Sequence, residues 1–124
     1  MKFKHYLLLG FKKTRRIYSL FITVIFYKIS FKRIGYNSII RSPLKIEGVC
    51  NITIGNNVLI GYKSWLAATP LTGESECNLL IHDGCSIGNF NHIFSTKRIE
   101  IQKNVLTADR VYISDNLHGY KDIN

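Results

Sequence analysis

The stretches ITIGNNVLIG (residues 52–61) and IHDGCSIGNFNHI (residues 81–93) repeat an isoleucine every six residues. Glycine often follows that isoleucine, and turn-forming pairs such as Asn56-Asn57 and Asp83-Gly84 lie between successive isoleucines. The spacing of six continues on both sides of an irregular stretch and is reset once, by two residues, near residue 100. Its members are Ile54, Ile60, Leu66, Ile81, Ile87, Ile93 and Ile99, then Ile101, Thr107 and Ile113.

A period of six fits neither an amphipathic helix, which repeats every three to four residues, nor a strand, which alternates every two. It predicts a coil of three short parallel strands joined by turns, with one branched side chain pointing inward from each strand. Coils of this kind stack about 4.8 Å apart, and each buries its apolar face only against its neighbours. The residues expected in this core are Ile54, Ile60, Ile81, Ile87, Ile93 and Ile113.

Residues 67–78 (AATPLTGESECN) interrupt the period. Pro70, Gly73 and several hydroxyl side chains predict a loop that leaves the coil. Such a loop either reaches over a functional site or is a tolerated surface insertion, and the sequence leaves both readings open.

Positive charge is concentrated at the N-terminus. Residues 1–41 contain ten Lys or Arg and no Asp or Glu, whereas residues 42–124 contain seven basic and eight acidic side chains. The uncharged run at residues 17–27 is shorter than the roughly twenty residues that span a bilayer. We therefore expect a basic amphipathic helical arm over residues 1–41, followed by an all-β domain over residues 42–124.

The arm has two readings that the sequence does not separate. It is either an interfacial helix on the anionic inner face of a membrane or a helix that packs on the protein or on a neighbouring subunit. No signal-peptide cleavage pattern follows it, so a cytoplasmic location is expected, with a possible site at the inner membrane face. Nucleic acid is not an expected partner, because the β domain is not basic.

The cysteines and most histidines are expected to be structural. Cys50, Cys77 and Cys85 form an odd set without CxxC spacing, which disfavours both a disulfide framework and a zinc site. His5, His82 and His92 match no metal-ligand spacing, so no metal is expected.

Together with VYISDNLHGY (residues 111–120), the repeats resemble the hexapeptide-repeat acetyltransferases that modify capsule, O-antigen and other sugars. The resemblance covers residues 42–124. It implies a left-handed parallel β-helix, a homotrimer, and acetyl-CoA bound as co-substrate between two subunits. The implied acceptor is a sugar or lipid-linked saccharide of surface-polysaccharide biosynthesis.

The resemblance also assigns residues. His118 matches the family's catalytic base, and a neutral imidazole suits the removal of a hydroxyl proton near neutral pH. Asn89 matches an acceptor-binding asparagine, although an ordinary turn role is an alternative. Asp115 either orients His118, binds the acceptor or caps a turn. Trp65 either lines a sugar groove or packs in the core or at a trimer contact, and no residue is assigned to acetyl-CoA.

Two departures from the family pattern affect the expected activity. Gln102 stands where glycine is usual, which a turn tolerates. The sequence stops six residues after His118, whereas family members continue with coils that complete the acetyl-CoA groove. The expected alternative to catalysis is therefore a non-catalytic, truncated β-helix that acts as a scaffold or oligomerisation module.

Overall fold

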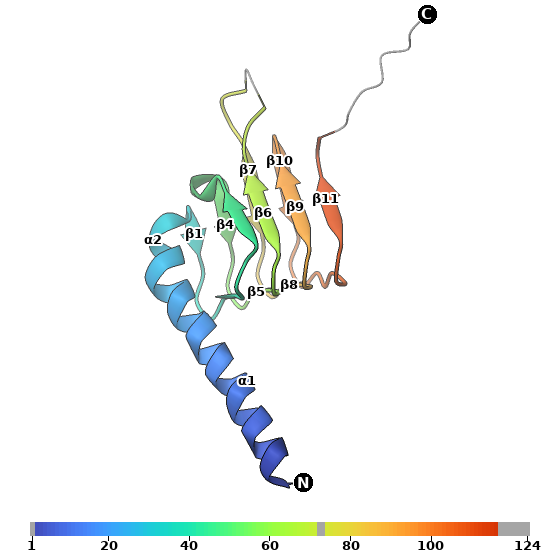
Figure 1. The fold of residues 1–124 in the computed structure, drawn as a ribbon. Helices are drawn as coiled ribbons and strands as arrows, with labels where there is room; N and C mark the ends of the chain where they lie inside the picture. The colour runs from blue at the N-terminus through green and yellow to red at the C-terminus, as the bar shows by residue number, and fades with distance from the viewer. Residues whose placement is uncertain (1, 72–73, 117–124) are drawn as a thin grey trace, which may run out of the picture.

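The computed structural model describes residues 2–71 and 74–116 of the chain. It begins with α1 (Lys2–Ile22), which continues through a π-helical segment, η1 (Thr23–Tyr27), into the short α2 (Lys28–Ser30). Short β-strands follow, with a 3-10 turn, η2 (Val49–Asn51), before the fourth (Figure 1). The strands are β1 (Arg33–Ile34), β2 (Ile39–Ile40), β3 (Lys45–Glu47), β4 (Ile52–Ile54), β5 (Leu59–Ile60), β6 (Trp65–Ala68), β7 (Asn78–Ile81), β8 (Ser86–Ile87), β9 (His92–Ser95), β10 (Arg98–Ile101) and β11 (Tyr112–Ser114).

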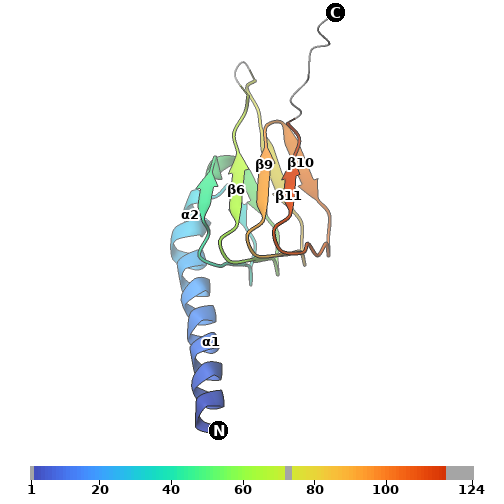
Figure 2. The same cartoon turned by 45° about the vertical axis from the view of Figure 1, so that its right-hand side comes forward.

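The strands form three parallel sheets that the chain visits in turn. The first sheet has the order β1-β4-β7-β10, the second β2-β5-β8, and the third β11-β9-β6-β3. Three consecutive strands, one in each sheet, make one triplet, and each triplet lies beside the next (Figure 2). In the last triplet an isolated bridge at Leu106 takes the place of a strand in the second sheet. An N-terminal helix followed by three parallel sheets is thus the architecture of the described residues. The predicted boundary at residue 41 is too late, because the helix ends at Ser30 and β1 and β2 already pair with the second triplet and bury Ile34 and Ile40.

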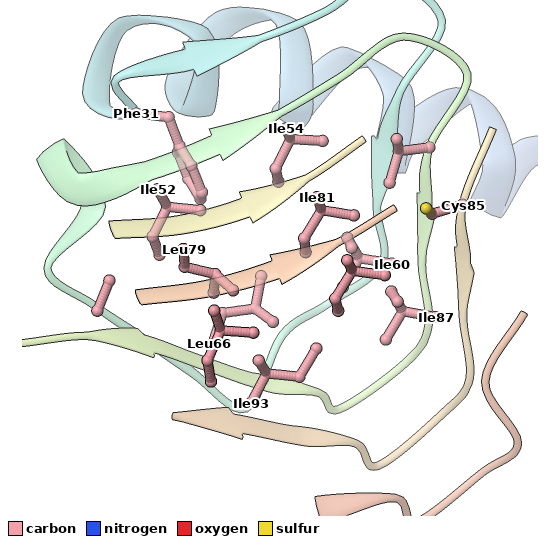
Figure 3. Packing of buried hydrophobic residues seen from close by; sticks show 14 of the residues in the cluster. Phe31, Ile52, Ile54, Ile60, Leu66, Leu79, Ile81, Cys85, Ile87 and Ile93 are labelled. Atoms are coloured by element: carbon pink, nitrogen blue, oxygen red, sulfur yellow. The ribbon is translucent and has the colours of Figure 1, made fainter. Parts of the chain in front are cut away.

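The core lies between the three sheets and is built from the periodic residues (Figure 3). Equivalent residues of successive triplets face one another, so that Ile34 is opposite Ile54, Ile54 opposite Ile81, and Ile81 opposite Ile101. The predicted core residues Ile54, Ile60, Ile81, Ile87 and Ile93 are at most 1% exposed. Ile113, on the last described strand, is half-buried and packs against the same cluster.

The two-residue reset near residue 100 reflects a feature that β4, β7 and β10 of the first sheet share: each strand buries two side chains. Ile99 and Ile101 are both buried on β10, and Leu79 and Ile81 occupy the opposite positions on β7. Ile52 and Ile54 do the same on β4. Each longer strand of this sheet therefore points two side chains inward, which adds two residues to the interval before the next inward isoleucine.

Close stacking of the turns explains the glycines of the repeat. A Cβ atom added at Gly61 would lie 2.5 Å from the carbonyl carbon and oxygen of Gly88 in the next triplet. The turns also use left-handed residues, among them Asn57 with φ 54°. Gln102 lies in the last triplet, where no later described strand covers it.

The interrupting loop is shorter than the sequence predicts. Ala67 and Ala68 belong to β6 and are fully buried, and Cys77 is buried just before β7 begins. The connection between these strands is therefore residues 69–77, and its described parts, residues 69–71 and 74–77, project beyond the sheets (Figure 1). The predicted segment of residues 67–78 was too long, because its small apolar ends fit into the core.

The C-terminal part of the helical arm packs on the first triplet. Thr23 is 1% exposed, and its Oγ1 donates a hydrogen bond to the carbonyl of Ser19 (2.7 Å) and accepts one from the backbone N–H of Ile40 (3.0 Å). Tyr27 and Phe31 pack against the end of the core. The N-terminal part of α1 extends away from the sheets (Figures 1 and 2). Among the described residues, no helix has the length and apolar character needed to cross a membrane.

Candidate functional site

The outer side of the third sheet carries a row of stacked side chains at equivalent positions of four strands. Lys45 is opposite Trp65, Trp65 opposite His92, and His92 opposite Tyr112. The Trp65 and His92 rings are stacked with centroids 4.1 Å apart, and the His92 and Tyr112 rings are tilted at 5.0 Å. We call these four residues the aromatic row. Parallel register produces it, because facing positions on neighbouring strands point to the same side of a sheet.

Glu47 holds one end of the aromatic row in place. Its carboxylate accepts a hydrogen bond from Trp65 Nε1 (2.9 Å) and forms an ion pair with Lys45 Nζ (2.8 Å). Two hydrogen bonds lower the pKa of Glu47 below its ordinary value. The one from Lys45 has the larger effect, and the one from Trp65 the next. Lys45 Nζ also lies 5.1 Å from the centre of the Trp65 ring. Because Trp65 stacks on His92 and also contacts Lys45, its ring is a packing element of this sheet rather than a free platform for a sugar.

His92 is the chemically distinctive member of the row. Its Nε2 atom is buried and has no hydrogen-bond partner among the described residues. Burial lowers the pKa of His92, and the nearby Glu47 carboxylate opposes that effect only in part. The side chain is therefore a neutral imidazole near neutral pH, with a nitrogen able to accept or donate a proton.

Tyr112 occupies the other end of the row, on the last strand of the third sheet, and is 63% exposed. Lys45 and Glu47 occupy the opposite end of the row. The sequence alone did not predict this row. A signal was present, since each member directly precedes an inward residue of the repeat, namely Ile46, Leu66, Ile93 or Ile113.

Asn89 lies in the turn between β8 and β9, and its side chain contacts the stacked turn between β5 and β6 of the preceding triplet. Its Oδ1 accepts a hydrogen bond from the backbone N–H of Tyr62 (2.8 Å), and its own N–H donates to Asp109 Oδ1 (2.7 Å). Asn56 makes the same kind of contact at a neighbouring corner, where its Oδ1 accepts from the N–H of Tyr36 (3.0 Å). Stacked turns thus satisfy one another, and Asn89 has the turn role that the sequence left as an alternative to acceptor binding.

Asp115 caps the tight turn between β9 and β10. Its carboxylate accepts hydrogen bonds from the backbone N–H groups of Thr96 (2.7 Å), Lys97 (2.9 Å) and Arg98 (2.8 Å) and from the Thr96 hydroxyl (2.8 Å). Burial alone would raise the pKa of Asp115, but these hydrogen bonds outweigh it and lower the pKa. The anchored carboxylate fixes the chain at the end of β11, three residues before His118.

The structure does not bring the two predicted substrate-binding residues together. Asn89 lies before β9 and Asp115 contacts the turn after it, so the four-residue strand separates them, a rise of about 13 Å. The predicted base, His118, lies outside the described residues.

The remaining histidines and the cysteines have structural surroundings. His82 Nε2 lies 2.7 Å from Glu100 Oε1 at the surface, and His5 lies edge-on to Tyr6 on α1. Cys77 and Cys85 are buried, as expected, whereas Cys50 is exposed. Within residues 2–71 and 74–116, no group of three or more His, Cys, Asp or Glu side chains is arranged to hold a metal ion.

Comparison of the chain with protein-family models, with curated proteins and with solved structures found no match.

Proposed function

We propose that the chain is a sugar O-acetyltransferase of the hexapeptide-repeat type, folded as a left-handed parallel β-helix. It would transfer the acetyl group of acetyl-CoA to a hydroxyl of a sugar or lipid-linked saccharide in surface-polysaccharide biosynthesis, in the cytoplasm. The observation that carries the proposal is the stacking of parallel triplets in register, in which Ile34-Gly35 lies on Ile54-Gly55 and Ile60-Gly61 on Ile87-Gly88. This arrangement is what the resemblance to the family implies for residues 42–124.

The proposed base is His118. In the reaction, the acceptor oxygen attacks the thioester carbonyl carbon while the imidazole takes the hydroxyl proton. The tetrahedral oxyanion then expels the sulfur of CoA, which leaves as the thiol after receiving that proton. Asp115 would act as a positioning residue, because its carboxylate anchors the strand end from which the His118 segment continues.

A homotrimer is part of this proposal, since the family binds acetyl-CoA between two subunits. The exposed β11 side of the aromatic row is the described surface that could face such a groove. His92 would then lie beside the groove as a neutral imidazole, and it is the rival candidate for the base if acceptor binding uncovers its buried Nε2.

The test measures acetyl transfer to a panel of mono- and disaccharides. The appearance of the CoA thiol reports the transfer rate, and calorimetry gives the affinity for acetyl-CoA. His118→Ala should lower kcat by about 10²–10⁴-fold while the circular dichroism spectrum is unchanged. His82→Ala is the matched control and should stay within a few-fold of the wild type. A loss in His92→Ala without a loss in His118→Ala would move the base to the aromatic row.

The second candidate function is a non-catalytic scaffold or oligomerisation module. It is favoured by the internal use of Asn89 and Asp115, whose side-chain oxygens bind backbone N–H groups of this chain. Absence of both acetyl-CoA binding and transfer, together with a stable oligomer in sedimentation experiments, would support this candidate and contradict the first.

A further inference from the structure

Helix α1 has an apolar side that points away from the sheets. Ser19 and Thr23, which face the sheets, are 9% and 1% exposed. Phe21 lies two positions from each of them, on the opposite side of the helix, and is 57% exposed. Other apolar residues share the side of Phe21 at helical spacing. We call the set Phe3, Tyr6, Leu7, Phe11, Ile17 and Phe21 the outer face, and its members are 57–80% exposed.

The outer face takes no part in the core. The hydrophobic cluster of the protein begins at Tyr27 and Phe31 and includes no residue of α1. Several large apolar side chains exposed together on one helix are uncommon on a monomeric protein surface and indicate an interaction site. The face therefore calls for a partner with an apolar surface.

Lysine and arginine side chains lie beside the outer face, and their positive charge indicates which charge a partner must carry. Lys4, Lys12, Lys13, Arg15 and Arg16 lie on the rest of α1, and residues 1–41 contain no Asp or Glu. A groove between α1 and the sheets is lined by Lys12, Arg15 and Arg41 together with Tyr62. The Arg15 guanidinium lies 5.6 Å from the centre of the Tyr62 ring. The partner must accordingly offer negative charge beside its apolar part.

We propose that the outer face of α1 binds the surface of an anionic lipid bilayer. The helix would lie in the membrane plane, because the cations along its other side are too costly to place in hydrocarbon. Its aromatic and aliphatic side chains would enter the boundary between headgroups and acyl chains. The lysines and arginines would remain at the level of the anionic headgroups. This proposal is independent of acetyl transfer and holds equally for a scaffold.

A second copy of the chain is a less suitable occupant. Two outer faces packed together would bring two sets of the same cations close to each other, with no carboxylate in residues 1–41 to pair with them. Like charges at such distances repel, and the repulsion grows as salt is reduced. An anionic bilayer provides the opposite charge over the whole length of the helix.

Flotation of the full chain with lipid vesicles tests the proposal. Binding should be strong to phosphatidylcholine vesicles that contain phosphatidylglycerol, weak to phosphatidylcholine alone, and reduced by added salt. The double variant Leu7→Glu/Phe11→Glu should bind at least about tenfold more weakly, since it removes two apolar anchors and adds two negative charges. Leu106→Glu is the matched control, because Leu106 is an equally exposed apolar residue (78%) outside the helix, and it should bind like the wild type.

Three results would overturn the proposal. They are equal binding to neutral and anionic vesicles, unchanged vesicle binding by the double variant, and an oligomer that the double variant dissociates. The last would assign the outer face to a second copy instead. Thermal unfolding of both variants should match that of the wild type, because all three substituted residues are exposed, so misfolding cannot imitate the expected loss.

Discussion

Helix α1 and the three sheets contain the same kinds of apolar side chain, but α1 exposes them and the sheets bury them. Ile17 on the helix is 59% exposed, whereas Ile60 on β5 is fully buried. A helix satisfies its own backbone hydrogen bonds, so the backbone of α1 can project from the body without hydrogen bonds to another element. A two-residue strand cannot, because its N–H and C=O groups and its isoleucine are satisfied only by neighbouring triplets. Apolar content alone therefore does not predict a core residue, whereas its period within a stacked element does.

The largest expected difference between the two regions comes from adding a charge to an isoleucine in each. Ile87→Asp should lower the free energy of unfolding by several kcal/mol, because Ile87 is 1% exposed and the carboxylate would be unpaired. Ile17→Asp, at a 59% exposed position, should cost less than about 1 kcal/mol. Urea unfolding followed by far-ultraviolet circular dichroism measures both. If Ile87→Asp does not fold, Ile87→Val should still cost about 0.5–1.5 kcal/mol. Equal losses at the two isoleucines would contradict the comparison.

Adding one methyl group should lower the free energy of unfolding in the sheets and raise the stability of the helix. Gly61→Ala would place a Cβ atom 2.5 Å from the backbone of Gly88, and we expect a loss of about 1–3 kcal/mol. Gly10→Ala has nothing within 4 Å and lies in a helix, so it should gain up to about 1 kcal/mol of helix stability. Thermal unfolding of the body and the helical signal of the arm check the two changes. A stabilising Gly61→Ala would show that the turns are less closely stacked than described.

The smallest expected difference between the two regions is in how their stability depends on acidic pH. Residues 1–41 contain no carboxylate side chain, so acid-dependent stability must arise in the body. The hydrogen bonds to Asp115 keep its folded pKa below the ordinary value of 3.8. Its contribution is therefore present above the ordinary value and is lost as the pH falls through the folded pKa. Since the group is partly exposed, we expect about 1 kcal/mol.

Asp115→Asn tests this contribution by urea unfolding over a series of pH values. The variant should be less stable than the wild type near neutral pH, and the difference should shrink in acid. Asp109→Asn is the control, because Asp109 accepts a single backbone hydrogen bond, from Asn89. A difference for Asp115→Asn that does not change with pH would contradict the role of the charged carboxylate.

Several functional expectations were open until the geometry was known. The period of six identified Ile54, Ile60, Ile81, Ile87 and Ile93 as core residues, but it did not place the end of β6 after Ala68. For Asn89 and Asp115 the sequence offered both turn and binding roles; the hydrogen bonds show the turn contacts of each, and acceptor binding stays a prediction. For His92 the sequence offered only a structural role. It did not reveal a buried imidazole nitrogen without a partner in the described part of the chain.

The sequence by itself did not determine where the helical arm ends, since β1 and β2 lie inside residues 1–41. It did determine the periodic inward positions, the turn residues and the concentration of positive charge near the N-terminus. These follow from neighbouring residues, since a strand alternates its sides and a turn needs particular backbone angles. Only the tertiary structure decided which side of α1 is free and that Trp65, His92 and Tyr112 form one row. It also decided that the Asp115 carboxylate closes the turn after β9. The ring contacts join residues 27 and 20 positions apart, and the Asp115 contacts join residues 17 to 19 positions apart, intervals set by the lengths of the strands, the corners and the loop after β6. No local pattern contains these intervals, so the register of the stacked strands had to supply them.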